Sequence, residues 1–147
     1  MTAHEKYRMP EGVRVICGFP GIGKSMLTQQ NLSFVDMDIP ELKNDIPQYI
    51  ERIRTALKIP GVTVLLPTWL NLRLGLWNEQ IPFVLFYPSA DLKADYHKRY
   101  SDRGSPQAMI DTMMKMWDVF LTTCWNDPTP HKVEMRQSQA RLSDYFL

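Results

Sequence analysis

The sequence predicts an α/β domain in which a central parallel sheet carries helices on both faces. Short apolar segments of strand length alternate along the chain with segments of helical periodicity. The 147 residues, 44% hydrophobic and 22% charged, are enough for one domain with a single core and leave little room for a second. We therefore treat residues 1–147 as a single domain.

Strands and helices follow one another in a regular order. The strands are expected over residues 13–17, 33–38, 62–66 and 82–87. The helices are expected over residues 24–30, 49–57, from about 68 onward, 90–100 and 106–124. Residues 1–11 lack periodicity, and the tail from Lys132 to Leu147 is expected to add a last strand or helix. Ligands of such sheets bind beyond the carboxyl ends of the strands.

The last of these helices is the longest. Ser105 is expected to cap it, with Pro106 at its first helical position. Apolar residues recur at helical spacing from Met109 to Cys124, so this helix is expected to pack against the sheet.

Composition excludes several classes of protein. The net charge is only +1, so a nucleic-acid partner is not indicated by the total charge and would need local basic clusters. No apolar stretch approaches the roughly 18 residues that a membrane span requires. Cys17 and Cys124 follow no secretory leader, so we expect them to be reduced core residues of a cytoplasmic protein.

A glycine-rich motif follows the first expected strand. The segment GFPGIGKS, from Gly18 to Ser25, matches the phosphate-loop pattern G-x-x-x-x-G-K-[ST]. Its glycines let backbone amides turn toward phosphate oxygens, Lys24 would reach the β and γ phosphates, and Ser25 would hold Mg²⁺. The pattern therefore predicts a P-loop NTPase that binds ATP and Mg²⁺. The expected nucleotide-binding residues are Gly18, Phe19, Pro20, Gly21, Ile22, Gly23, Lys24, Ser25 and Met26.

Two carboxylates end the second expected strand. Asp36 and Asp38 are at alternate positions, which places both on one side at the carboxyl edge of the sheet. Asp36 is expected to orient the magnesium ion, and Asp38 to take a proton from an attacking hydroxyl. This pair favours an alcohol acceptor, and the same spacing occurs in shikimate kinase and related alcohol kinases. The structural alternative is an Asx-type turn or a helix cap that closes the strand.

The third expected strand runs into an aromatic residue instead of a second acidic motif. Thr68 and Trp69 are expected at the edge of the site, where the indole ring could stack on a base or simply cover the first turn of a helix. Arg73 follows on that helix and is a candidate for contact with the acceptor, or for a solvated surface. We include all three residues, with Asp38, among the candidates for substrate binding.

A basic segment at about residues 91–105 follows the fourth expected strand. Small P-loop kinases carry a lid here, and we expect Arg99 and Arg103 to close over the γ phosphate. Lys93 is a weaker candidate, because it could belong to a solvated helix face.

Several of these motifs together resemble one group of proteins. The segments GFPGIGKS, DMD, P-x-Y-I at residues 47–50, LR at 72–73 and YHKRYSDRGSP resemble small phage and prophage P-loop kinases, over about residues 13–125. Within that group the chain looks like the phage 5-hydroxymethyluracil DNA kinases, which are relatives of thymidylate kinase. The resemblance implies a fold like that of nucleoside monophosphate kinases. It assigns the ATP phosphates to Gly21, Gly23, Lys24 and Ser25, the acceptor chemistry to Asp36 and Asp38, and the lid charge to Arg99 and Arg103.

The resulting expectation is a kinase of the host cytoplasm that uses ATP and Mg²⁺. Its best acceptor is the 5-hydroxymethyl group of hydroxymethyluracil in DNA, so the expected partner is DNA with a modified pyrimidine. Basic residues at Lys93, Lys98, Arg99 and Arg103, and at Lys132, Arg136 and Arg141, would contact the DNA backbone if they line one groove. The alternatives are a thymidylate-like kinase that acts on a free deoxynucleotide, and a nucleotide-binding switch module without kinase activity.

Overall fold

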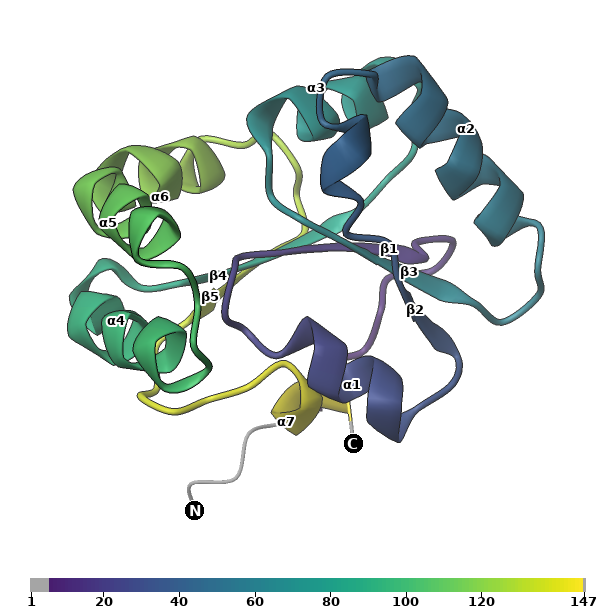
Figure 1. The fold of residues 1–147 in the computed structure, drawn as a ribbon. Helices are drawn as coiled ribbons and strands as arrows, with labels where there is room; N and C mark the ends of the chain where they lie inside the picture. Colours follow the sequence, from purple (N-terminus) through teal and green to yellow (C-terminus); the bar gives the residue numbers. More distant parts are fainter. Residues whose placement is uncertain (1–5, 147) are drawn as a thin grey trace.

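A five-stranded sheet, parallel between every neighbouring pair of strands, forms the centre of the computed structural model, which describes residues 6–146 (Figure 1). The strands lie in the order β2-β3-β1-β4-β5. Their bounds are β1 Val15–Gly18, β2 Phe34–Asp36, β3 Thr63–Leu66, β4 Val84–Pro88 and β5 Lys132–Met135. The predicted α/β class with a parallel sheet is confirmed. The expected lead-in begins at residues 1–5, which lie outside the described part.

Helices cover both faces of this sheet. They are α1 Lys24–Gln30, α2 Ile46–Leu57, α3 Leu70–Asn78, α4 Lys93–Asp102, α5 Gln107–Lys115, α6 Trp117–Trp125 and α7 Ser143–Phe146, with short 3₁₀ turns η1 Pro40–Leu42 and η2 Ala90–Leu92. In Figure 1, α1 and α7 lie below the sheet and α2, α3 and α6 above it, while α4 and α5 lie near the end of β1. The loops that follow β1 and β4 therefore meet at one edge.

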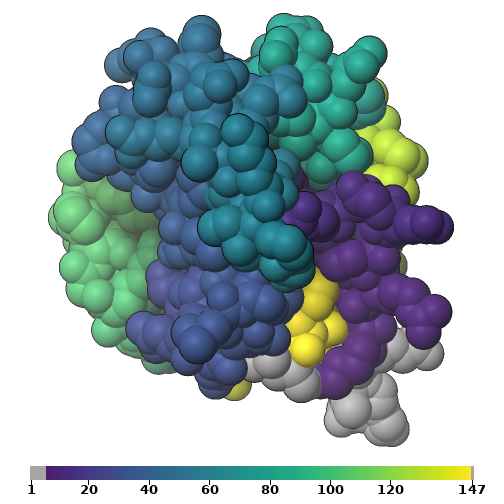
Figure 2. All heavy atoms as spheres, turned by 90° about the vertical axis from the view of Figure 1, so that its right-hand side faces the viewer, coloured from purple at the N-terminus to yellow at the C-terminus, as the bar shows by residue number. Residues whose placement is uncertain are grey.

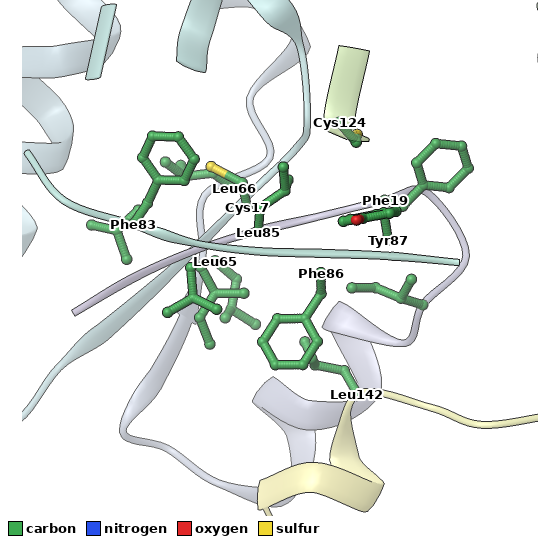
Figure 3. Packing of buried hydrophobic residues seen from close by; sticks show 14 of the residues in the cluster. Cys17, Phe19, Leu65, Leu66, Phe83, Leu85, Phe86, Tyr87, Cys124 and Leu142 are labelled. Carbon is green, nitrogen blue, oxygen red and sulfur yellow. The ribbon is translucent and has the colours of Figure 1, made fainter. Parts of the chain in front are cut away.

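The core has two layers, one on each face of the sheet. Because side chains alternate along a strand, Leu65 and Phe86 point toward Leu142, while Cys17 and Leu66 point toward the opposite face, on which α6 lies (Figure 3). All of these side chains are buried. The N-terminal and C-terminal segments also meet, since the amide of Tyr7 donates to the carbonyl of Tyr145 at 2.8 Å, and Figure 2 shows the yellow C-terminal residues beside the purple ones.

The long helix expected over residues 106–124 is in fact two helices. The chain breaks at Met116, whose φ of −97° and ψ of 8° lie outside the helical range. Immediately after the break, the indole nitrogen of Trp117 donates to the carbonyl of Ala90 at 3.0 Å, which fixes the direction in which α6 leaves. The predicted cap is also wrong. Pro106 occupies the N-cap position, and the hydroxyl of Ser105 accepts from Arg103 instead.

Two further observations concern membrane-spanning helices and the two cysteines. Within residues 6–146, no helix has the length and apolar character that crossing a bilayer requires. Cys17 and Cys124 are both buried free thiols, and burial raises the pKa of each, that of Cys124 to about 11. Their expected place in the core is confirmed.

Candidate functional site: the phosphate loop and the acidic turn

The segment that matches the phosphate-loop motif, residues 18–25, is called the phosphate loop here for its sequence pattern. It joins the end of β1 to the start of α1 and depends on glycine. Gly21 and Gly23 have φ angles of 90° and 98°, a region that residues with side chains rarely adopt. A Cβ atom at Gly21 would also lie 2.9 Å from a ring carbon of Tyr100. Glycine is therefore required at this position by both backbone conformation and space.

Backbone carbonyls of the loop are held by segments that are distant in sequence. The carbonyl of Pro20 accepts from the hydroxyl of Tyr100 at 2.8 Å, that of Gly21 from Arg99 at 3.0 Å, and that of Ile22 from the amide of Leu142 at 2.7 Å. In a planar trans peptide the N–H points away from the preceding carbonyl. The amides of Gly21 and Gly23 therefore face away from the supporting segments, as an anion-binding loop requires.

Other residues of the expected nucleotide site have structural roles. The amide of Phe19 donates to the carbonyl of Phe86 at 3.0 Å, and the amide of Ile22 donates to the carbonyl of Phe19 at 3.2 Å. The side chains of Phe19 and Ile22 are buried, and Met26 is exposed on α1. These two amides are already satisfied, so Gly21 and Gly23 are the better candidates for phosphate contact.

Lys24 brings a buried cation to the loop. Its side chain is 9% exposed, and its ammonium donates to the carbonyl of Gly18 at 2.6 Å. Burial lowers the pKa of Lys24, while the nearby Asp38 and Asp36 raise it. The loop thus has a positive charge inside it and two carboxylates close by.

The acidic turn, residues 36–39, follows β2 directly. The strand ends at Asp36, three residues long instead of the six expected, because beyond it the carboxylate of Asp36 accepts from the amide of Asp38 at 3.1 Å. This is the Asx-type turn that was the structural alternative. The same carboxylate also lies 3.4 Å from the hydroxyl of Ser25, so the turn and the phosphate loop share one site.

The environment of Asp38 changes the proton affinity of its carboxyl group. Partial desolvation raises the pKa of Asp38, Lys24 lowers it and Asp36 raises it. Asp36 and Asp38 are exposed, and the side chain of Met37 is buried between them. Both carboxylates can therefore meet a ligand that lies on the phosphate loop.

A cavity of about 770 Å³ opens beside the phosphate loop. Its walls are Phe19 and Pro20 of the loop, residues 68–71 at the start of α3, and residues from α5 and α6. Thr68 and Trp69 both line it, as does Lys43, whose ammonium lies 5.3 Å from the centre of the Trp69 ring. Two of the four expected substrate-binding residues, Thr68 and Trp69, thus line one mostly apolar pocket, while Asp38 and Arg73 are not among its lining residues.

Arg73 does not face this pocket. Its side chain is 1% exposed and forms an ion pair with Asp127 at 2.8 Å. The guanidinium also donates to the carbonyls of Thr68 and Thr123 and to the Thr123 hydroxyl. The expectation that Arg73 contacts the acceptor is therefore corrected: all three of its nitrogens are engaged between α3 and α6.

The basic segment 91–105 forms η2, α4 and a short loop, and its two arginines differ. Arg99 is buried and bonded to Asp95, Gly21 and Ala140, so it is a fixed support of the phosphate loop and not the mobile arginine that was expected. Arg103 is exposed, and its guanidinium lies 5.1 Å from the centre of the Tyr100 ring. Its charge lowers the pKa of both Lys24 and Asp38, while its described contacts are with Ser105 and Tyr100.

Two of the other basic residues are paired with acidic neighbours in sequence. Lys98 bonds Asp102 at 2.6 Å and Arg136 bonds Glu134 at 2.9 Å, and these two pairs reduce the charge that a polymer backbone would meet. Lys132 donates to the carbonyl of Trp125, a neutral acceptor that does not offset its charge.

Magnesium ligands are limited to few residues. No cluster of three or more histidine, cysteine, aspartate or glutamate residues with metal-binding geometry occurs in the described part of the chain. Ser25 and Asp36 offer two exposed oxygen donors beside the phosphate loop. This set fits Mg²⁺, which usually takes one or two protein ligands and completes its shell with water and substrate phosphate.

Two residues that support the site or replace an expected contact were missed at the level of sequence. Tyr49 of α2 bonds to the backbone of the acidic turn, and Asp127 engages Arg73. Tyr49 had a signal, its place in the P-x-Y-I segment, but its spacing there indicated only core packing. Nothing in the local pattern distinguishes Asp127 from a loop aspartate.

Comparison with protein-family models finds no match, and comparison with curated proteins finds none either. The fold and the site themselves define the class of this protein. It is an α/β protein with a five-stranded, all-parallel sheet and a glycine-rich loop after β1 that faces an acidic turn after β2.

Proposed function

We propose that this protein is a P-loop kinase that transfers the γ-phosphate of ATP to a hydroxyl group, with the 5-hydroxymethyl group of hydroxymethyluracil in DNA as the best candidate. One observation carries the proposal. The hydroxyl of Ser25, in the glycine-rich loop, and the carboxylate of Asp36, two residues before Asp38, lie 3.4 Å apart. The motif that would bind phosphate is therefore adjacent to the turn that carries the candidate general base.

The donor side would act by charge and geometry. The amides of Gly21 and Gly23 bind phosphate oxygens, and Lys24 neutralises charge that develops between the β and γ phosphates. Arg103, which is exposed on the lid segment, would approach the γ phosphate from there. When Mg²⁺ is bound, Ser25 and Asp36 hold it, and it supplies further charge neutralisation and orientation.

On the acceptor side, Asp38 would receive the proton of the attacking hydroxyl. The hydroxyl oxygen forms a bond to the γ-phosphorus, the bond to the bridging oxygen of ADP breaks, and the proton passes to the Asp38 carboxylate. Desolvation and Asp36 raise the pKa of Asp38, which makes its carboxylate a better proton acceptor than an ordinary exposed one.

The cavity beside the loop favours an uncharged ring as acceptor. Trp69 offers an aromatic face, and the lining is mostly apolar. Lys43 is the one cationic side chain among the described residues of the pocket lining, and Arg73 is engaged with Asp127. This lining suits the uncharged pyrimidine ring of either acceptor, and the transfer assay decides between modified DNA and a free deoxynucleotide.

The test is transfer of labelled γ-phosphate from ATP to three acceptors: hydroxymethyluracil-containing DNA, unmodified DNA and free deoxynucleoside monophosphates. We expect label on the modified DNA alone, and loss of label with Lys24→Met. Lys58→Met, which removes an exposed lysine at the far end of α2, is the matched control. Transfer only to free monophosphates would establish the thymidylate-like activity instead, and ATP hydrolysis without transfer to any acceptor would establish a switch module.

A further inference from the structure

Tyr49 of α2 is hydrogen-bonded to the backbone of the acidic turn. Its side chain is fully buried, its hydroxyl donates to the carbonyl of Met37, and the same hydroxyl accepts from the amide of Ile39 at 3.0 Å. Met37 and Ile39 are the residues on either side of Asp38. One hydroxyl group thus holds the backbone both before and after the candidate general base.

The ring of Tyr49 contacts the other part of the acceptor site. It packs edge-on against Trp69, with ring centres 5.9 Å apart and an angle of 76° between the planes. Trp69 lines the pocket beside the phosphate loop. A single side chain therefore touches both the turn that carries Asp38 and the aromatic wall of the pocket.

The remaining backbone hydrogen bonds of the turn, within the described residues, are local or belong to the sheet. The amide of Met37 donates to the carbonyl of Leu65 at 2.9 Å, which continues the pairing of β2 with β3. The amide of Asp38 donates to the side chain of Asp36. The Tyr49 hydroxyl therefore supplies the long-range contact that ties the turn beyond the strand to a helix.

We propose that Tyr49 is a positioning residue that sets the location of the Asp38 carboxylate relative to a ring bound against Trp69. This inference rests on the proposed kinase function. Tyr49 does not touch the reacting atoms. It acts through the backbone of the turn and through the packing of Trp69. A displacement of about 1 Å at a reacting centre can lower a rate by about 100-fold, so the effect of a small shift in this turn is measurable.

The test is Tyr49→Phe, which keeps the ring against Trp69 and removes the hydroxyl. We expect kcat for phosphate transfer to fall by about 10-fold to 100-fold, while the KM for ATP changes by less than about 2-fold. The matched control is Tyr96→Phe. Tyr96 is also fully buried, but its hydroxyl has no hydrogen-bond partner within residues 6–146, so kcat should not change.

A second variant separates positioning from general loss of structure. 4-Aminophenylalanine at position 49 has nearly the shape of tyrosine and again offers a donor to the Met37 carbonyl, so it should recover a large part of the lost kcat. The inference is overturned if Tyr49→Phe retains the wild-type kcat. It is equally overturned if kcat, ATP affinity and thermal stability fall together in both position-49 variants, since that pattern indicates a structural role alone.

Amide hydrogen exchange tests the link between Tyr49 and the turn without requiring phosphate transfer. Tyr49→Phe should reduce the protection of the Ile39 amide, which loses its acceptor, and leave unchanged the protection of the Phe19 amide, which donates to the carbonyl of Phe86. If the wild-type protein transfers no phosphate while this exchange pattern appears, the proposed kinase function fails but the structural link from Tyr49 to the turn holds. Unchanged protection at Ile39 would overturn the link itself.

Discussion

The phosphate loop and the acidic turn lie side by side but are stabilised differently. Three consecutive loop carbonyls, those of Pro20, Gly21 and Ile22, accept hydrogen bonds from α4 or from the segment before α7. The backbone of the acidic turn has Tyr49 as its one long-range side-chain partner among the described residues, and both of the turn's carboxylates are exposed.

The difference follows from which atoms would contact a ligand in each region. The loop must present backbone amides, so its backbone has to be held in conformations that are unfavourable without support. The turn presents carboxylate side chains, which need only a fixed attachment point. We therefore expect substitutions in the supports of the loop to reduce folding stability, and substitutions in the turn to reduce catalysis with little effect on stability.

Arg99→Met should produce the largest loss of stability. The change removes the bonds to Gly21 and Ala140 and leaves Asp95, which is 17% exposed, without its ion-pair partner, although the hydroxyl of Ser138 still donates to it. Breaking a buried ion pair in this way costs about 3–5 kcal/mol in the free energy of unfolding. Denaturant unfolding of the full chain measures this loss of stability. The control is Arg136→Met, which breaks an ion pair whose arginine is 76% exposed and should cost less than about 1 kcal/mol. Similar losses in the two variants would contradict the role of Arg99.

Asp38→Asn should separate catalysis from stability. The amide cannot accept the proton of an attacking hydroxyl, so we expect kcat to fall by about 10²-fold to 10⁴-fold, with unchanged ATP binding and unfolding. Initial rates with labelled ATP and calorimetric titration of ATP provide the measurements. Glu41→Gln removes a nearby exposed carboxylate and should leave kcat within about 2-fold. A weak effect of Asp38→Asn would favour an acceptor that is already ionised, such as a monophosphate.

Gly21→Ala should disturb the phosphate loop by a smaller amount. The new Cβ meets Tyr100 at 2.9 Å, and the φ of 90° adds backbone strain, so we expect a loss of about 1–3 kcal/mol and weaker ATP binding. Gly12→Ala is a matched control, because Gly12 has a φ of 79° but a Cβ atom added there would meet nothing within 4 Å among the described residues. The difference between the two variants measures the contact with Tyr100. Equal losses would show that backbone strain alone accounts for the effect.

Tyr96→Phe should have the smallest effect, and it should increase stability, whereas Arg99→Met and Gly21→Ala decrease it. Its hydroxyl is buried without a hydrogen-bond partner in the described part of the chain, although the ring packs on Phe19 and Trp117. Removing an unsatisfied polar group should raise the free energy of unfolding by about 1 kcal/mol. Thermal unfolding would show it as a higher Tm. A lower Tm would indicate that the hydroxyl has a partner such as a bound water molecule.

The sequence predicted the strands and most helices because their signals are local. Apolar runs flanked by glycine and proline identified β1, β3 and β4, and helix α1 was predicted at the bounds it has. The break at Met116 was missed because apolar periodicity continues through it, and the change of direction is fixed by the bond from Trp117 to Ala90.

The candidate site residues also divide into those with a local sequence signal and those whose role depends on distant contacts. The phosphate-loop motif and the two aspartates could be recognised because their spacing is itself the signal. Arg73 and Arg99 could not be assigned correctly, because an arginine in sequence does not reveal its partner. Both are buried against residues 54 or 41 positions away, Asp127 and Ala140.

By itself, the sequence determined the class of fold, the position of the glycine-rich loop and the presence of two carboxylates after β2. These depend on backbone propensity and on spacing, which are properties of short segments. The tertiary structure decided the strand order, which arginines are available, and how the loop and the acidic turn are held. Those outcomes depend on burial and on hydrogen bonds between distant segments, and Tyr49 and Leu142 acquire their contacts with the site only when the chain folds.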